Sequence, residues 1–328
     1  MNIGLTYDLR STYLAQGYSQ EETLEFDRDD TIAAIETTLA DLGHHCQRIG
    51  NGRQLVEALA TGSRWDLVFN IAEGLHGIGR EAQVPALLDL YQIPYTFSDP
   101  LVMALTLHKG MTKRVIRDAG LATADFQIVE QLEDLEQLTI PPPWFIKPVA
   151  EGTGKGVTPE SIVRERSQLT GAVAALLARF HQPVLVESLL TGREFTVGVV
   201  GSGNDAQVIG SIEVILLGSA EQGVYSCLNK KEYEDRVEYC LVSGQDDPEV
   251  QAAEELALKS WQVLGCRDGG RIDIRSNGQK QPQFIEVNPL AGIHPEHSDL
   301  PIICNKLGIP YSELLGRIIA SAEKRIRS

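Results

Sequence analysis

The chain has 328 residues, of which 43% are hydrophobic and 23% are charged, and its formal net charge is −16. This composition is typical of a globular protein with two or three domains. Such an acidic chain argues against broad binding to nucleic acid or to anionic membranes. An anionic small molecule is still compatible with it, because a few Lys and Arg residues set the field of a single cleft.

The N-terminal sequence lacks the basic start and the long apolar core of a signal peptide. No apolar run approaches the roughly 18 residues of a membrane helix. The cysteines are scattered without a CxxC pair, so neither a disulfide framework nor a zinc site is predicted. We therefore expect a cytoplasmic protein with reduced thiols at Cys46, Cys227, Cys240, Cys266 and Cys304.

The first hundred residues alternate between expected strands and helices. Apolar runs mark the strands, and the helix over residues 31–42 shows Ile32, Ile35 and Leu39 at helical spacing, with Gly43 at its end. Strands that alternate with helices predict a parallel sheet, and hence a small Rossmann-like α/β domain. The expected elements span residues 2–7, 31–42, 55–60, 65–70, 84–91 and 93–96.

Two connections in this part are polar. Residues 7–29 form an irregular segment that contains Arg10 and Glu25, and nothing local gives either residue a function. The loop over residues 73–81 has three glycines and follows an expected strand. His76 lies in this loop, where a lone histidine is more often a surface residue than a catalyst.

The rest of the chain also mixes strands and helices. The helix expected at 106–119 carries Lys109 and Lys113 and ends at Gly120. A polar stretch covers residues 218–238. The other expected strands span 144–148, 183–187, 194–200 and 208–216, and the other expected helices span 168–180, 249–264 and 311–326.

A glycine-rich loop follows the strand-borne Lys147. Gly152, Gly154 and Gly156 alternate with other residues, and glycine permits positive φ and close backbone approach. Such a loop can aim successive N–H groups at a phosphate. Its spacing matches neither GxxxxGK[ST] nor a GxGxxG that opens a long helix. The structural alternative is a flexible hairpin tip. Glu187 and Glu194 are two carboxylates separated by the end of a strand and a turn. Instead of a functional pair, they could be solvated acids on an edge strand.

Two expected strands near the C-terminus alternate polar and apolar residues. Residues 271–274 and 284–288 are separated by a Ser-Asn-Gly turn signal. If the strands pair, one face carries Arg271, Asp273, Glu286 and Asn288. Hard oxygen ligands beside a guanidinium suit Mg²⁺ and phosphate. An antiparallel hairpin with one solvated polar face explains the same pattern equally well.

The order of these motifs resembles the ATP-grasp superfamily, and within it proteins like D-alanine–D-alanine ligase. The resemblance spans nearly the whole chain and predicts an ATP-grasp fold of mixed α/β class. It implies a pre-ATP-grasp domain at 1–104, a central subdomain with the glycine loop at 105–186, and a C-terminal subdomain at 187–328. The segments that carry it are Leu75-His76-Gly77, Ile93-Pro94-Tyr95-Thr96, residues 107–113, Lys147-Pro148 with the glycine loop, Val186-Glu187, residues 192–196, Arg271-Ile272-Asp273 and Glu286-Val287-Asn288 with Gly292.

The resemblance also implies roles for individual residues. The ATP site would comprise Lys109, Lys147, Gly152, Thr153, Gly154, Glu187, Ser188, Leu190, Glu194 and one lysine of the pair 230–231, taken as Lys231. Asp273, Glu286 and Asn288 would hold two Mg²⁺ ions, with Mn²⁺ as an alternative. The residues expected at the reacting groups are Arg271, Glu25, His76, Gly292 and Ser298.

The resemblance implies a ligase that activates a carboxylate as an acyl phosphate and joins it to an amine. The glycine loop and residues 218–238 would close over the site and exclude water. The expected partners are small molecules, an amino acid or small carboxylate plus an amine; a homodimer is one candidate assembly.

Several positions depart from the family pattern, and all lie where the two amino acids are expected. The glycine loop has Thr153 instead of a serine, the acid near the N-terminus follows a long insertion, and the run after His76 reads Gly79-Arg80-Glu81. The segment 292–298 holds two histidines. Three hypotheses follow: a D-alanine–D-alanine ligase, a ligase for another amino acid or natural-product acid, and a non-catalytic ATP-binding homologue. The retained metal-and-arginine set argues against the third.

Overall fold

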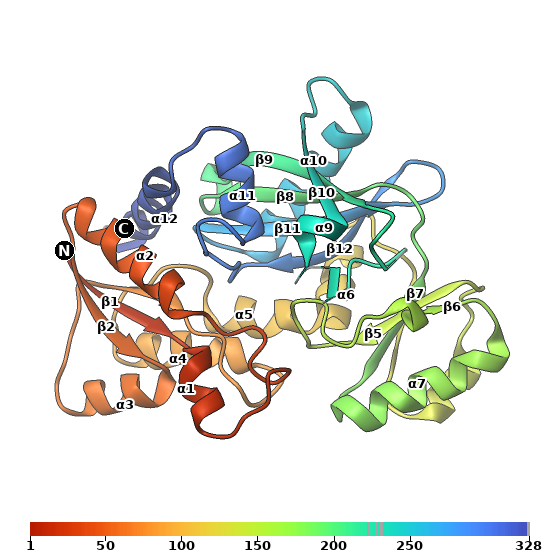
Figure 1. Ribbon diagram of the computed structural model, residues 1–328, viewed down its shortest axis with the longest axis horizontal. Helices are drawn as coiled ribbons and strands as arrows, with labels where there is room; N and C mark the ends of the chain where they lie inside the picture. The colour runs from red at the N-terminus through yellow and green to blue at the C-terminus, as the bar shows by residue number, and fades with distance from the viewer. Residues whose placement is uncertain (222, 227, 230–231, 327–328) are drawn as a thin grey trace.

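The protein is described from a computed structural model that covers residues 1–326 except 222, 227, 230 and 231 (Figure 1). Three separate sheets organise the chain, and they follow one another along the sequence. In the described part, no helix has the length and apolar character needed to cross a membrane.

The N-terminal sheet is parallel, as the alternation of strands and helices predicts. β1 (Asn2–Tyr7) lies between β2 (His45–Gly50) and β3 (Leu67–Ile71) and is parallel to both. Every residue of β3 is buried, which is typical of a strand covered on both faces. The helices of this part are α1 (Arg10–Ala15), α2 (Asp29–Asp41), α3 (Gly52–Ala60) and α4 (Gln83–Leu90), with a 3₁₀ turn, η1, at Arg80–Ala82.

The second sheet carries the glycine loop. Its strand order is β4 (Phe126–Val129), β7 (Val184–Ser188), β5 (Trp144–Pro148) and β6 (Ile162–Val163), all antiparallel. α7 (Arg166–Phe180) covers one face and buries Leu169 and Val173 against it. Two helices, α5 (Pro100–Leu107) and α6 (Lys109–Asp118), connect the first sheet to the second.

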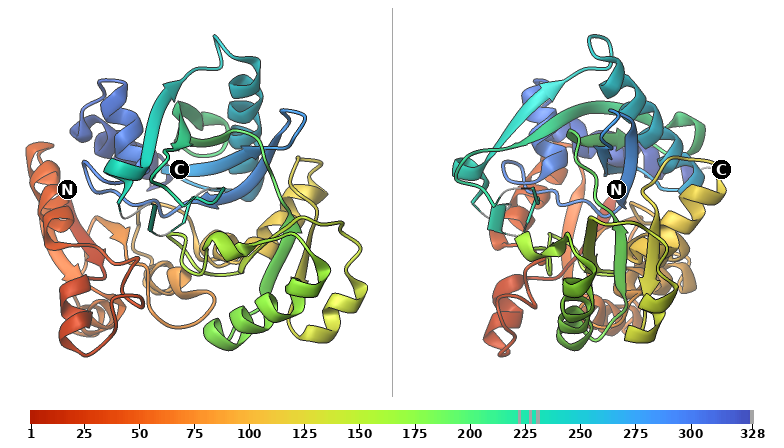
Figure 2. Two further views of the ribbon diagram at one scale, coloured as in Figure 1. Left: turned by 45° about the vertical axis from the view of Figure 1, so that its right-hand side comes forward. Right: turned by 90° about the vertical axis from the view of Figure 1, so that its right-hand side faces the viewer.

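The third sheet is antiparallel throughout. Its strands run in the order β10 (Val237–Val242), β9 (Gln207–Leu216), β8 (Glu194–Val200), β11 (Gly269–Ser276) and β12 (Pro282–Asn288). α10 (Pro248–Leu264) buries Trp261 against it, and α11 (Asp299–Lys306) contacts β8 and β9. The short α9 (Tyr233–Arg236) precedes β10. Figure 2 shows the second and third sheets one below the other.

The last helix returns the chain to its beginning. α12 (Tyr311–Ile326) packs against α2, and its buried residues share one apolar cluster with β1 and β3. Figure 1 shows both termini on the same side of the molecule. The N-terminal sheet is therefore held against the third sheet by the end of the chain.

Four sequence-based expectations for elements need correction. The single helix predicted at 106–119 is two helices, because His108 interrupts it and its side chain caps α6 by accepting from Met111 N at 3.2 Å. Residues 7–29 contain α1, and the polar stretch 218–238 holds α9 and the start of β10. Residues 93–96 make only a bridge from Tyr95 to Val68. α11 was not predicted at all.

We propose that the three sheets mark three domains. The predicted boundary between residues 186 and 187 falls inside β7, which pairs with β4 and β5. A boundary after Ser188 keeps that strand with its partners.

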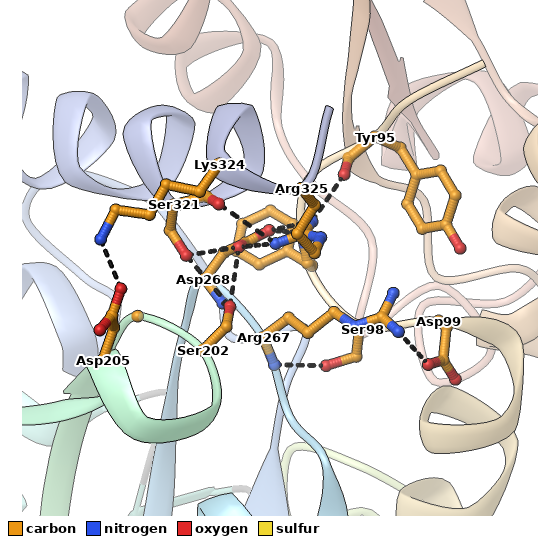
Figure 3. A network of polar contacts seen from close by, with 12 residues as sticks. Tyr95, Ser98, Asp99, Ser202, Asp205, Arg267, Asp268, Ser321, Lys324 and Arg325 are labelled. Atoms are coloured by element: carbon orange, nitrogen blue, oxygen red, sulfur yellow. Dashed lines mark hydrogen bonds and ion pairs between the residues drawn. The ribbon is translucent and has the colours of Figure 1, made fainter. Parts of the chain in front are cut away.

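A buried carboxylate fixes the N-terminal part, the third sheet and α12 to one another (Figure 3). Asp268, which is fully buried, accepts hydrogen bonds from Phe97 N at 2.7 Å and Ser321 Oγ at 2.8 Å. Arg325 pairs with the same carboxylate and also donates to Tyr95 O at 3.0 Å. Because Asp268 directly precedes β11, this contact sets the position of the strand that carries Arg271 and Asp273.

Replacing Asp268 with alanine should lower the free energy of unfolding by about 3 kcal/mol, because a buried N–H and a guanidinium lose their acceptor. The matched control is Asp205→Ala, since Asp205 also pairs with α12, through Lys324, but is 64% exposed. That change should cost much less, because an exposed ion pair contributes little to stability. Urea unfolding of both variants measures the difference, and equal losses would contradict the assignment.

Candidate active site

A cavity between the second and third sheets is lined by residues from both. This cavity, of about 800 Å³, lies between β5, β7 and the glycine loop on one side and β8, β11 and β12 on the other. Phe145, Leu189 and Ile285 supply apolar walls. The sequence-predicted residues in its lining are Lys109, Lys147, Gly154, Glu187, Ser188, Leu190, Glu194, Asp273 and Glu286.

Two buried lysines share one carboxylate at the inner end of this cavity. Glu187 pairs with Lys113 at 2.9 Å and with Lys147 at 3.0 Å. Burial alone raises the pKa of Glu187, but the two lysines outweigh it and hold that pKa below its usual value. Burial likewise disfavours the charged form of Lys147, yet Glu187 and Glu286 raise its pKa. Lys147 is therefore a fixed positive charge in the cavity wall.

The C-terminal hairpin forms with the predicted strands. β11 and β12 are antiparallel, with Asp273 opposite Glu286 and Arg271 opposite Asn288. Residues opposite one another lie on the same face, so all four side chains share it. The predicted pairing of the two strands is therefore confirmed.

Cations and a hydroxyl compensate the acids of this face. Lys109 Nζ lies 3.2 Å from Glu286, and Thr196 Oγ1 donates to Asp273 at 2.9 Å. Arg271 lies 2.9 Å from Asp299 and 3.8 Å from Asp273. Burial lowers the pKa of Arg271, but these carboxylates outweigh burial and raise it, so the guanidinium stays charged.

Two further cavities adjoin this hairpin face. One of about 680 Å³ is lined by Lys109, Arg271, Glu286 and Asn288 together with Glu25, Gly152 and Gly292. The other, of about 1660 Å³, is lined by Arg271, Gly292, Ser298, Tyr225 and the two histidines of residues 292–298. Arg271 lines both cavities, so the structure brings it together with the predicted Glu25, Gly292 and Ser298.

Glu25 joins the N-terminal segment to the glycine loop. Its carboxylate accepts from Arg80 Nη2 at 2.7 Å and from Gly152 N at 2.6 Å. Arg80 is only 7% exposed and also donates to Ala150 O at 2.9 Å. A Cβ at Gly152 would lie 2.5 Å from Glu25 Oε1, so a side chain at this position would displace the Glu25 carboxylate.

The loop before α11 is also tightly built. Ser298 Oγ accepts from His294 N at 3.0 Å, and a Cβ at Gly292 would lie 2.7 Å from that hydroxyl. The rings of His294 and His297 stack with centroids 4.5 Å apart. Gly292 therefore lets the loop turn against Ser298.

Two predicted residues are not placed in these cavities. His76 is exposed, and its ring faces Tyr18 with centroids 6.4 Å apart. It is absent from the linings described above. Lys231 lies outside the described residues.

The sequence analysis gave no role to two acids that line the 680 Å³ cavity, Glu73 and Glu81. Glu73 follows β3 after one residue, and Glu81 lies in η1. A signal for Glu73 was available, because ligands in open α/β sheets bind at the carboxyl ends of the parallel strands. The sequence motifs instead indicated His76, three residues later.

Comparisons with known proteins give one consistent result. The sequence model of the family described as D-ala D-ala ligase C-terminus matches residues 115–320. The chain is 32% identical over 316 residues to a D-alanine–D-alanine ligase of Actinobacillus pleuropneumoniae serotype 5b, covering 95% of this chain and 97% of that protein. It is 31% identical over 301 residues to the Bordetella avium ligase of the same name, covering 90% of each.

Solved structures show the same fold. The chain superimposes with a TM-score of 0.72 and 20% identity on the D-alanine–D-alanine ligase from Bacillus anthracis complexed with ATP, covering 99% of this chain and 98% of that one. The VanG D-Ala:D-Ser ligase from Enterococcus faecalis gives a TM-score of 0.72 at 18% identity, with 98% and 99% covered. The predicted ATP-grasp fold with a parallel N-terminal sheet is confirmed.

Replacing Arg80 with methionine should loosen the glycine loop, because Glu25 then loses its cation and Ala150 O its donor. A lost charge-assisted hydrogen bond of about 1.5–3 kcal/mol corresponds to roughly 10- to 100-fold faster hydrogen exchange at the Gly152 amide. The control is Arg179→Met, which breaks an ion pair between α7 and Glu21 that is about half exposed on both sides. Unchanged exchange in Arg80→Met would show that Glu25 holds the loop without Arg80.

Proposed function

The chain belongs to the D-alanine–D-alanine ligase family, and on that premise we propose that it joins the carboxyl group of one D-alanine to the amino group of a second, with conversion of ATP to ADP and phosphate. One observation supports this most directly. Arg271, Asp273, Glu286 and Asn288 share one face of a hairpin, beside the cavity that the lysine-led glycine loop covers.

ATP would occupy the 800 Å³ cavity. Lys109 and Lys147 would contact the phosphates, and the glycine loop would close over them through Gly152, Thr153 and Gly154. Two successive residues of this loop have positive φ, Thr153 at 53° and Gly154 at 70°. Successive residues of this kind turn backbone N–H groups toward one concavity, which suits an anion. The base would lie against Glu187, Ser188 and Leu190, with the ribose at Glu194; the role of Lys231 stays a prediction.

The residues present fit a magnesium site. Asp273 and Glu286 face one another, and Asn288 lies on the same face of the hairpin. Mg²⁺ takes a few carboxylate and amide oxygens and leaves the other positions to phosphates and water. Among the described residues, no three His, Cys, Asp or Glu side chains lie close enough together to hold a metal ion, so the site would depend on the Asn288 amide oxygen and on the nucleotide. When bound, two Mg²⁺ ions (or Mn²⁺) would neutralise the charge on the transferring phosphoryl group.

The chemistry follows from the groups around Arg271. A carboxylate is a poor acyl donor, because its leaving group would be oxide. Attack of the carboxylate oxygen on the γ-phosphorus of ATP gives an acyl phosphate and ADP, and attack of a neutral amine on the acyl carbon then expels phosphate. Arg271, fixed between Asp273 and Asp299, stabilises the negative charge that develops in both steps. Gly292 and Ser298 would orient the second substrate.

Water must be kept from the acyl phosphate, and the structure offers two covers. The glycine loop is tied to Glu25, and Tyr225 of the stretch 218–238 lines both the nucleotide cavity and the 1660 Å³ cavity. The hydroxyls of Tyr225 and Tyr239 are 2.5 Å apart. Closure of these covers would exclude water from the intermediate.

A second candidate function is ligation of a different amino acid. Side chains around the two cavities proposed for the amino acids favour it. Glu73 lines the 680 Å³ cavity, next to the buried Arg80, and the stacked rings of His294 and His297 line the 1660 Å³ cavity. In either case we propose that the substrates are small molecules. We also propose a cytoplasmic location and a homodimer, both of which have to be measured.

Phosphate release with ATP and Mg²⁺ tests the proposal against a panel of single and paired amino acids. Release with D-alanine and no other amino acid supports D-alanine ligation, and release only with a different amino acid supports the second function. No release with the whole panel, by protein that binds ATP, would overturn both.

Glu286→Ala should lower the rate of phosphate release on the order of 10³-fold, because Lys109 and the proposed metal site lose their shared carboxylate. The fold should survive, since Glu286 lines a cavity and is not part of the core cluster beneath the hairpin. Glu255→Ala, at an exposed position of α10, is the control and should retain full activity. Near-normal turnover of Glu286→Ala would refute the assignment. Chelation of Mg²⁺ by EDTA should stop release in the unmutated protein.

A further inference from the structure

We propose that Arg275 is a positioning residue that couples the ribose end of the nucleotide cavity to the cover segment, residues 218–238. When the ribose of a nucleotide occupies Glu194, Arg275 holds the cover segment closed. This coupling rests on the nucleotide site of the proposed function, and it gives a role to an arginine that belongs to none of the sequence motifs.

Arg275 lies on the face of β11 that also carries Arg271 and Asp273, because the three residues follow one another at intervals of two. Four residues of a strand span about 13 Å, so Arg275 lies well away from the groups that react beside Arg271. It is directly opposite Glu194 of β8, and both side chains line the nucleotide cavity. Arg275 is therefore placed to act on the ribose end of the site and not on the phosphoryl group.

The guanidinium of Arg275 has three polar contacts. Nη1 lies 3.3 Å from Glu194 Oε2 and donates to Gly223 O at 3.2 Å, while Nε donates to Gly192 O at 3.3 Å. One nitrogen is thus shared between the carboxylate proposed for the ribose and a backbone carbonyl of the cover segment. The Arg275 side chain is only 18% exposed, and a charge with so little access to water depends on such acceptors.

A bound ribose would shift this balance toward the cover segment. Its hydroxyls would donate to Glu194 and occupy part of the carboxylate that now accepts from Arg275. Gly223 O is the other acceptor at the same Nη1 nitrogen, so the guanidinium would hold Gly223 more tightly. A ligand that favours one of two conformations in this way shifts the protein toward it.

Gly223 is the point where the cover segment meets both sides of the cleft. Arg275 binds it from the third sheet. On the other side, a Cβ at Gly223 would lie 2.9 Å from Ile162 Cδ1, and Ile162 belongs to β6 of the second sheet. A contact that fixes Gly223 therefore connects the two sheets across the opening of the nucleotide cavity.

One buried side chain makes the cover segment move as a unit around Gly223. The amide of Asn229 donates to Glu221 O at 2.9 Å and to Val224 O at 2.8 Å, and its Oδ1 accepts from Glu221 N at 3.0 Å. Tyr225 follows directly in the chain and lines both the nucleotide cavity and the 1660 Å³ cavity. Fixing Gly223 thus also fixes Tyr225 at the junction of the two cavities, where the acyl phosphate must be kept from water.

Hydrogen exchange tests the coupling without depending on turnover. Exchange is measured at the amides of Glu221 and Asn229 with Mg²⁺ and a saturating non-hydrolysable ATP analogue, and again with the 2′,3′-dideoxy form of that analogue. In the unmutated protein the ribose form should slow exchange about 10-fold more than the dideoxy form, which corresponds to one charge-assisted hydrogen bond. In Arg275→Met the two forms should agree within about 3-fold, because no guanidinium connects Glu194 to Gly223.

Turnover supplies a second measurement. Arg275→Met should raise the ratio of phosphate released to amide product at least about 3-fold with ATP, because a looser cover segment lets water reach the acyl phosphate. In the unmutated protein 2′,3′-dideoxy-ATP should raise the same ratio, and in Arg275→Met it should add no further increase.

Arg193→Met is the matched control. Arg193 directly precedes β8 and pairs with Glu213 and Asp247, and it is absent from the lining of the nucleotide cavity. Its loss should destabilise the protein in urea but leave the effect of the ribose on exchange unchanged. Arg275→Lys keeps a charge beside Glu194 without the planar fork of donors, and it carries the same test if Arg275→Met is too unstable to study.

Equal protection by the ribose and dideoxy analogues in the unmutated protein would overturn the inference, and so would a difference between them that survives in Arg275→Met. An increase in the phosphate ratio that is as large in Arg193→Met as in Arg275→Met would also overturn it. Ribose-dependent protection in a protein that releases no phosphate with any amino acid would instead count against the proposed ligase function alone, so the two failures are distinguishable.

Discussion

The pairing of β11 with β12 is the constraint on which the rest of the site depends. It places Asp273 directly opposite Glu286, and like charges in that position destabilise a hairpin. The sheet tolerates them because Lys109 and Thr196 reach the face from outside the hairpin. Lys109 is in position because α6 begins there, after the cap at His108, and because its own N–H bonds to Val149 O at 2.9 Å. The hairpin, α6 and the strand before the glycine loop are thus fixed by one set of charges.

The cleft between the second and third sheets combines fixed cations with acids that already neutralise them. Lys147 and Lys113 share Glu187, and Lys109 faces Glu286. Buried charges are tolerated only when they are paired, so each cation has a partner when no anion is bound. A phosphate group that enters must share these lysines with the carboxylates. This explains how a chain with a net charge of −16 retains a local site for an anion.

The sequence was most informative where chemistry lies on regular strands. Alternation of polar and apolar residues predicted the face that holds Arg271, Asp273, Glu286 and Asn288, because strand periodicity fixes which side chains share a face. It failed where irregular segments carry the residues. Glu73 and Glu81 reach their cavity from a loop and a 3₁₀ turn, and no local pattern tells which of His76, Glu73 or Glu81 points inward. The break at His108 was missed because capping by a histidine side chain leaves the helical periodicity on both sides intact.

The contrast between regular strands and irregular segments also separates the proposed nucleotide site from the proposed amino-acid site. Apart from Lys109 at the start of α6, the residues that we propose for the nucleotide lie on β5, β7, β8, β11 and β12 or in the loops after them. On a strand, a one-residue shift would turn a side chain to the opposite face. The residues that we propose for the amino acids, such as Glu25 and Ser298, lie in connections between elements. Connections tolerate substitution and insertion because few ladder hydrogen bonds depend on them. The physical consequence is that the identity of the amino-acid substrate can change in this fold while the phosphate-binding geometry stays fixed.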